Sequence, residues 1–360
     1  MRIALALASA IAALAIVEAA VRVLAPAYNP TGRVAFTRLP DGTLIGPPNA
    51  VRRQIRNTGE YDVFVRFNQW GLRDPKPLPE STADSIAVVG DSFAFGWGVE
   101  ESQRFSDVLQ ARLGRPVYNL SAGLADLDGY GRLLHYAESN GLRSGTLIVS
   151  VCMENDIREY GPDESGQWDQ PPLSATKNFL TDHSAAYGVV ATAIHRSPWI
   201  ERAAVRAGLV VPSLAAIAES DPGDEAVQSS AARLRELVSG RHAVVLIVPS
   251  RALWAGTTEQ RRQAGQTNDT FVRLLRQAGL KVVDVRATFE QRERPLSLYF
   301  PNDGHWTAEG HRIAGEALAN VIERSVRLQP DVRLKADATE EKARAGAPDF
   351  ASTSGPPPAQ

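Results

Sequence analysis

The sequence predicts an α/β fold, in which a parallel β-sheet carries helices on its faces and an apolar helix precedes it. From Ile86 onward, short runs rich in β-branched residues alternate with segments of helical periodicity, which is the pattern of a parallel sheet covered by helices. The chain also begins with an uncharged apolar run from Ile3 to Val17, which favours a hydrophobic N-terminal helix.

The expected strands are short and bounded by turn residues. They are Ile86–Val89, Val117–Leu120, Thr146–Val151, Ala243–Val248 and Val282–Val285. Apolar residues recur at helical spacing in other segments, at 105–113, 130–137, 271–275 and 313–322. Gly114 and Pro116 end the first of these helices.

Composition limits the class of protein. The chain has 360 residues, 44% hydrophobic and 22% charged, which is typical of a globular protein. With 39 Lys and Arg against 41 Asp and Glu, it has no basic excess of the kind that nucleic-acid binding needs. The single cysteine, Cys152, excludes an internal disulfide and a cysteine-built metal site, and the six histidines are scattered, so we expect no metal and no other cofactor.

The N-terminal apolar segment predicts export. Counted through Ala25 it is long enough to cross a bilayer, and Arg2 before it favours an N-terminus inside the cell with the rest outside. Glu18 and Arg22 lie four residues apart on one helix face, where they can pair. Residues 1–27 are therefore either a membrane anchor, with the body outside the cytoplasm, or a signal peptide cleaved near Ala25–Ala27.

The rest of the chain divides by composition. Residues 28–85 form a connector rich in Pro and Gly with one strand-like stretch, Tyr61–Phe67. Residues 86–328 form the α/β domain, and its long excursion at 153–224 is expected to carry helices at Tyr187–Ile194 and Ile200–Val211 and to act as a lid. Residues 329–360 are polar and are predicted to be a disordered tail.

Residues that could carry out chemistry follow four of the expected strands. These are Ser92 after the first strand, Gly123 after the second, Asn155 after the third, and Asp303 with His305 after the fifth. Because ligands bind beyond the carboxyl ends of parallel strands, we expect these residues to meet at one rim of the sheet. A serine, a base with its orienting acid, and oxyanion donors are the components of acyl-transfer catalysis.

The blocks that carry these residues resemble those of the SGNH hydrolases, also called the GDSL esterase and lipase family. The first is Gly90-Asp91-Ser92-Phe93, and the resemblance covers about residues 84–326, with a lead-in at Asn68–Asp74 that is similar to one in anchored members. It implies a three-layer α/β/α flavodoxin-like fold with five parallel strands in the order 2-1-3-4-5.

We expect Ser92 to be the nucleophile and His305 the general base that takes its proton. Asp303 is expected to orient His305, although the family usually has its acid three residues before the histidine, where this chain has Asn302. A backbone carbonyl orienting His305 is the alternative. Asp91 is expected to shape the nucleophile turn by accepting backbone N–H groups.

The oxyanion hole is expected to consist of the Ser92 and Gly123 backbone N–H groups and the Asn155 side-chain amide. In the third block, Met153 replaces the family's usual glycine. Outside the site, His311 and Cys152 are expected to be structural, and Trp97 and Trp306 either wall the substrate site or pack in the core.

Three functions fit these residues. The first is a cell-envelope serine esterase acting through an acyl-enzyme on an acylated glycan, a lipid or a small ester. The second is an O-acyltransferase in which a sugar hydroxyl replaces water, and the third is a non-catalytic binding module on the same fold. The combination of Ser92, Asn155 and His305 argues against the third, because binding has no need of it.

Overall fold

A computed structural model of the protein describes residues 2–30, 34–56, 59–161, 183–197 and 221–327, together with 179–180, 199–200, 203, 206 and 217–219. By their internal contacts, residues 1–318 form one unit and residues 319–360 a second.

The expected tail at 329–360 lies outside the described residues, and so does most of the expected helix Ile200–Val211.

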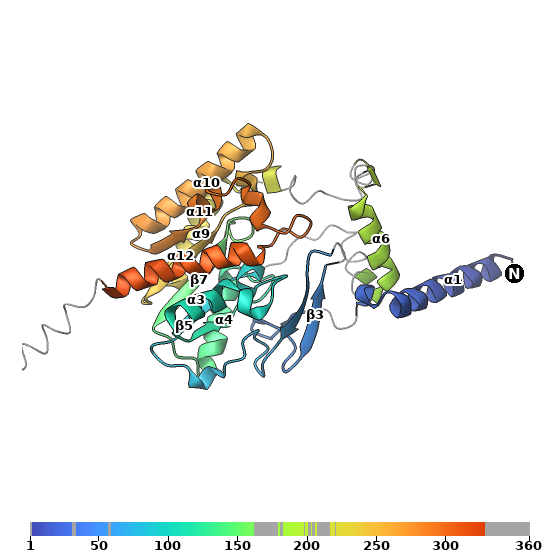
Figure 1. The fold of residues 1–360 in the computed structure, drawn as a ribbon, viewed down its shortest axis with the longest axis horizontal. Helices are drawn as coiled ribbons and strands as arrows, with labels where there is room; N and C mark the ends of the chain where they lie inside the picture. The colour runs from blue at the N-terminus through green and yellow to red at the C-terminus, as the bar shows by residue number, and fades with distance from the viewer. Residues whose placement is uncertain are drawn as a thin grey trace, which may run out of the picture. The chain divides into compact units, whose positions relative to one another are not determined.

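A five-stranded parallel sheet forms the centre of the first unit (Figure 1). Its strands run in the order β6-β5-β7-β8-β9, which is the predicted order 2-1-3-4-5. Their bounds are β5 Ile86–Val89, β6 Val117–Asn119, β7 Thr146–Cys152, β8 Ala243–Val248 and β9 Lys281–Asp284. All four pairings are parallel, so the predicted fold class is confirmed.

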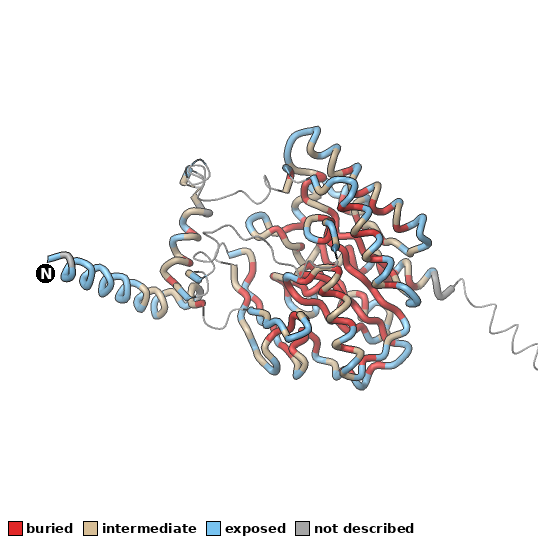
Figure 2. Tube along the Cα trace, turned by 180° about the vertical axis from the view of Figure 1, so that it is seen from behind, coloured by how far each residue is buried: buried red, intermediate tan, exposed pale blue. Residues whose placement is uncertain are grey.

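The central strands are mostly apolar because both of their faces are covered. Every residue of β5 and β7 is buried. Alternate side chains such as Ala87 and Val89 belong to one core with buried residues of α4, α9 and α10. The buried strands are visible as the red centre of Figure 2. The opposite face belongs to α3 and the first turns of α12, where the rings of Phe105 and His311 stack 6.1 Å apart.

The helices of the α/β domain follow the strands as a doubly wound sheet requires. Their bounds are α2 Ser92–Phe95, α3 Phe105–Leu113, α4 Leu127–Ser139, α9 Gly223–Leu237, α10 Thr258–Gln277, α11 Arg286–Glu290 and α12 Ala308–Arg327. Short 3₁₀ turns accompany them at η1 Pro26–Tyr28, η2 Leu78–Glu80, η3 Glu101–Gln103, η4 Arg251–Leu253 and η5 Pro295–Leu298. Four of the long helices, α3, α4, α10 and α12, were predicted from the sequence, whereas α9 was not.

The segment before the sheet is more ordered than the connector that the sequence predicts. It contains two antiparallel hairpins, β1 Thr37–Arg38 with β2 Leu44–Ile45, and β3 Val51–Ile55 with β4 Asp62–Arg66. In β4 the buried residues Val63 and Val65 alternate with exposed ones, so one face of this hairpin is buried. Only β4 was expected from the sequence.

Two further helices belong to the N-terminal segment and to the excursion. Helix α1, Arg2–Leu24, is mostly apolar and is exposed along most of its length (Figure 2). Helix α6, Ala185–Arg196, covers the expected helix Tyr187–Ile194. Their contact is polar at one point: the Glu18 carboxylate pairs with Arg22 at 2.7 Å and accepts bonds from Ser184, Ala185 and Ala186 at the start of α6.

Candidate active site

The turn between β5 and α2 presents Ser92 at the first position of a short helix. Asp91 is the N-cap, and its Oδ1 accepts the backbone N–H of Phe93 at 2.9 Å, as expected. Gly90 packs tightly against Ser150 of β7, where an added Cβ would lie 2.9 Å from the Ser150 Cβ. The turn is therefore held close to the sheet, and Ser92 stays half-buried at its rim.

Ser92, His305 and Asp303 form one hydrogen-bonded chain. The Ser92 Oγ lies 2.7 Å from the His305 Nε2, and the His305 Nδ1 lies 2.5 Å from the Asp303 Oδ1. The bond to Asp303 fixes the proton of His305 on Nδ1 and leaves Nε2 free to accept the Ser92 hydroxyl proton. An acid two residues before the histidine therefore reaches the ring directly.

The surroundings of Asp303 keep it ionised. Burial alone would raise the pKa of this carboxyl, but the bond from His305, the charge on that ring and the bond from Tyr61 outweigh it and lower the pKa to about 2. Asp303 is thus a carboxylate at neutral pH and can stabilise an imidazolium.

The three expected oxyanion donors follow three different strands, β5, β6 and β7. No acceptor within the described chain takes the backbone N–H of Ser92 or Gly123. Gly123 is buried beneath Phe36 and beside Trp97, and an added Cβ there would lie 2.8 Å from the Phe36 ring. The exposed Asn155 side chain donates one amide hydrogen to Asp91 Oδ2 at 2.9 Å, which leaves its second amide hydrogen for another acceptor.

Asp156 fixes the loop that carries Asn155. Its Oδ2 accepts hydrogen bonds from the Cys152 N–H and the Tyr130 hydroxyl, each at 2.8 Å, and its own backbone N–H donates to the Cys152 carbonyl. Burial raises the pKa of both Asp156 and Asp91. The loop after β7 and the turn after β5 are joined through the bond between Asn155 and Asp91.

Residues 213–357 match the family model described as the SGNH hydrolase-like domain of the acetyltransferase ALGX. Residues 213–357 of the chain are thus similar to an SGNH hydrolase-like domain. The matched segment includes Asp303 and His305 and begins after Ser92 and Asn155. No curated protein matches this chain.

Several solved structures are similar to this chain at low sequence identity. A lipase/acylhydrolase from Enterococcus faecalis is 9% identical, with a TM-score of 0.39 over 67% of this chain and 96% of its own. A variant of an acetylxylan esterase from Geobacillus stearothermophilus is 14% identical, with a TM-score of 0.37 over 67% of this chain and 95% of its own. A lipolytic protein of the G-D-S-L family from Veillonella parvula is 11% identical, with a TM-score of 0.37 over 67% and 98%.

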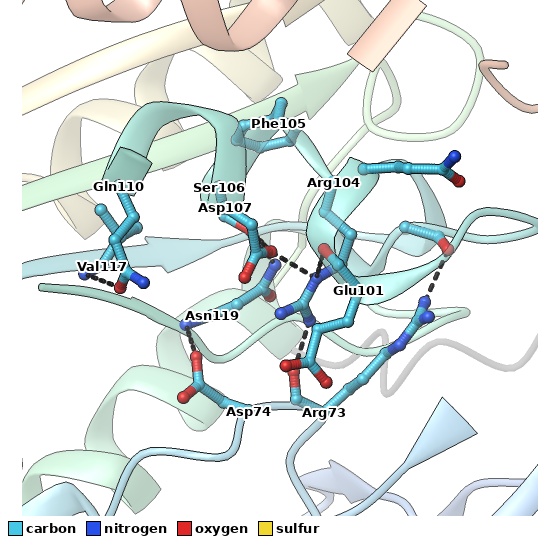
Figure 3. A network of polar contacts seen from close by, with 12 residues as sticks. Arg73, Asp74, Glu101, Arg104, Phe105, Ser106, Asp107, Gln110, Val117 and Asn119 are labelled. Carbon is cyan, nitrogen blue, oxygen red and sulfur yellow. Dashed lines mark hydrogen bonds and ion pairs between the residues drawn. The ribbon is translucent and has the colours of Figure 1, made fainter. Parts of the chain in front are cut away.

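The lead-in segment Asn68–Asp74 supports the turn and short helix that carry Ser92. The Arg73 guanidinium is buried and donates to the carbonyls of Phe95, Gly96 and Val99, at 3.2, 2.7 and 2.7 Å. The side-chain amide of Asn119 donates to the Ala94 carbonyl at 2.7 Å. The backbone N–H of Asn119 donates to the Asp74 carboxylate (Figure 3). The free carbonyls at the end of α2 are thereby satisfied, which fixes the helix that begins at Ser92.

The remaining residues named from the sequence divide into packing and site residues. Trp306 is fully buried, with its ring 5.4 Å from that of Phe93, so it packs in the core. Trp97 is half-buried, and its ring lies 5.7 Å from that of His305, beside the site. Cys152 is buried, and burial raises the pKa of its thiol, which disfavours a thiolate nucleophile.

Sequence reasoning missed two groups of residues at the site. Tyr61, Arg56 and Glu60 of the β3–β4 hairpin contact the loop that carries Asp303. Arg251, after β8, pairs with Glu154 at 2.9 Å and packs under Gly304, whose positive φ of 91° suits a glycine. The first group had no signal in the sequence, whereas the position of Arg251 at a strand end was a usable one.

Proposed function

We propose that this protein is a serine-dependent acyl-handling enzyme that forms an acyl-enzyme on Ser92 and releases the acyl group by hydrolysis. The observation that carries the proposal is the continuous chain from Ser92 Oγ through His305 to Asp303, with contacts of 2.7 and 2.5 Å. A binding module has no need of a serine whose proton can pass to an oriented imidazole.

The chemistry follows from that chain. His305 Nε2 takes the hydroxyl proton as Ser92 Oγ attacks the ester carbonyl, and the negative Asp303 stabilises the imidazolium. The same proton then goes to the departing alcohol oxygen, which leaves the acyl group on Ser92. Water, deprotonated by His305, attacks the acyl-enzyme and restores the serine.

The developing oxyanion needs donors on the side of Ser92 away from His305. We assign this role to the Ser92 and Gly123 N–H groups and to the free amide hydrogen of Asn155. Asp91 supports the assignment for Asn155, because its Oδ2 holds the amide nitrogen of that side chain at 2.9 Å.

Acyl transfer to a hydroxyl acceptor is the second candidate, and the match to an acetyltransferase's SGNH hydrolase-like domain favours it. Both reactions share the acyl-enzyme and differ only in what attacks it. Adding a polyol or an oligosaccharide to a p-nitrophenyl acetate assay separates them. A transferase yields the acetylated acceptor in proportion to acceptor concentration, whereas a hydrolase yields acetate throughout.

We further propose that α1 anchors the protein in a membrane, with the catalytic domain outside the cytoplasm. A carboxylate inside an apolar segment needs a partner, and Glu18 has Arg22 and the first N–H groups of α6. The full-length protein is expected to sediment with membranes and to stay there in high salt. Cleavage near Ala25–Ala27 would instead give a soluble product lacking the first residues.

Substitution of Ser92 by Ala tests the catalytic proposal. Hydrolysis of p-nitrophenyl acetate is expected to fall by at least about 10³-fold, and labelling by an alkyl fluorophosphonate is expected to disappear. Ser297→Ala, at an exposed serine in η5, is the matched control. Undiminished turnover by a folded Ser92→Ala protein contradicts the mechanism.

A further inference from the structure

The β3–β4 hairpin contacts both loops that carry the catalytic residues. Gln54 of β3 accepts the backbone N–H of Gly98, after the nucleophile helix, at 2.7 Å. Arg56 donates to the carbonyl of Asn302, and Glu60 accepts the N–H of the same residue, each at 2.7 Å. The backbone carbonyl and the backbone N–H of Asn302, next to the catalytic acid, are thus both hydrogen-bonded to this hairpin.

Tyr61, just before the second hairpin strand, contacts the catalytic acid itself. Its hydroxyl lies 2.8 Å from Asp303 Oδ2, the oxygen that His305 does not use. The Tyr61 side chain is buried, with its ring 5.1 Å from that of Phe300 and against Gly98. Packing on two sides therefore fixes the position of this hydroxyl.

The direction of the bond to Asp303 is set by Trp97. The indole Nε1 of Trp97 can only donate, and it lies 2.9 Å from the Tyr61 oxygen. The Tyr61 oxygen accepts that bond, so its single proton is directed to Asp303 Oδ2. Trp97, Tyr61, Asp303 and His305 thus form one ordered series of donors and acceptors that ends at Ser92.

We propose that Tyr61 is a positioning residue for the reaction, acting through Asp303 on the orientation and basicity of His305. The inference rests on the proposed function of Ser92. The two-residue spacing between Asp303 and His305 leaves Asp303 Oδ1 close to both the ring Nδ1 and the backbone N–H of His305, at 2.5 and 3.4 Å. Tyr61 holds the other oxygen, so the carboxylate cannot rotate away from the ring.

The proposal predicts a particular change in pH dependence. A donor to Asp303 Oδ2 withdraws negative charge from the oxygen that faces His305. Without it, Asp303 stabilises the imidazolium more strongly, and the acid limb of kcat/KM moves to higher pH. The groups facing Asp303 are His305 on its own loop, with Tyr61 and Arg56 on the hairpin. Arg56 Nη1 lies 3.7 Å from Asp303 Oδ2 and acts in the same direction as Tyr61.

Tyr61→Phe in the full-length protein is the test. We expect kcat to fall by about 10- to 100-fold and the acid limb to shift upward by about half a pH unit. Tyr136→Phe is the matched control, because it also deletes a hydroxyl, one that donates to the Trp70 carbonyl at 3.2 Å outside the site. Arg56→Gln is a second variant at an exposed side chain, expected to give a smaller upward shift that disappears in high salt.

The outcomes separate this inference from the function on which it rests. If Tyr61→Phe matches Tyr136→Phe in rate and pH profile while Ser92→Ala is inactive, the positioning role is overturned and the proposed function stands. A loss of rate that follows a loss of folded protein, with an unchanged pH profile and no shift in Arg56→Gln, also overturns it. Full activity of Ser92→Ala rejects the proposed function first.

Discussion

Two histidines six residues apart, His305 and His311, occupy opposite environments. Each follows a glycine, one on the loop before α12 and one in the first turns of that helix. The His305 side chain is 21% exposed, and its two ring nitrogens contact the Asp303 carboxylate and the Ser92 hydroxyl. His311 is fully buried, its Nδ1 accepts the Phe105 N–H at 3.3 Å, and its Nε2 has no partner among the described residues.

The charges around the two rings also differ in sign. His305 lies against the carboxylate of Asp303. His311 is near the buried guanidinium groups of Arg73 and Arg104; burial first, and then these two charges, lower its pKa to about 3. A histidine can serve as a base only where its cation is tolerated. The acid partner and the access to solvent at His305 therefore matter more than the residue type.

His305→Gln and His311→Asn give the largest expected contrast. The first variant loses the base, so kcat/KM is expected to fall on the order of 10⁴- to 10⁶-fold with little change in stability. The second keeps an acceptor near the Nδ1 position and is expected to retain activity within a few-fold. Steady-state hydrolysis and thermal unfolding of both proteins check this, and comparable activity in the two would remove the distinction.

Asp303→Asn tests whether the carboxylate is what distinguishes the two environments. The amide keeps the shape of the side chain but presents the wrong donor to Nδ1, so a fall in kcat of about 10³- to 10⁴-fold is expected. If a backbone carbonyl orients His305 instead, the variant retains nearly full activity. Steady-state hydrolysis and thermal unfolding of the variant, measured beside the wild type, check this.

Residues on the sheet rim could be predicted from the sequence because strand ends are marked locally. A β-branched run, followed by Gly90 and Asp91, fixes where β5 stops and where Ser92 must lie. The order of the strands came from the family resemblance, since periodicity alone does not say which strands are neighbours.

The β3–β4 hairpin shows what the sequence could not supply. The bond between Tyr61 and Asp303 joins residues 242 positions apart, and no local pattern indicates that these two residues meet. Helix α9 was missed for a different reason, since it adjoins an excursion of uncertain length and begins after Pro222 without a side-chain cap. Contacts between distant segments depend on tertiary packing, so they appear only when the chain is folded.

The smallest expected effect concerns the stability that His311 gives as a neutral group. Its folded pKa of about 3 lies below the value of 6.5 for an unperturbed histidine, so the unfolded chain binds the proton more readily. The stabilisation is fully present above pH 6.5 and is lost as the pH falls toward 3. At pH 5 the free energy of unfolding is expected to be about 2 kcal/mol lower than at neutral pH because of this one group. His311→Asn starts from a lower stability but lacks this titration, so its unfolding free energy should fall less steeply between pH 7 and pH 5. Denaturant titrations of both proteins at these two pH values measure the difference. If the unfolding free energy falls equally with pH in wild type and variant, His311 accepts a proton without penalty. That result would end the contrast with His305.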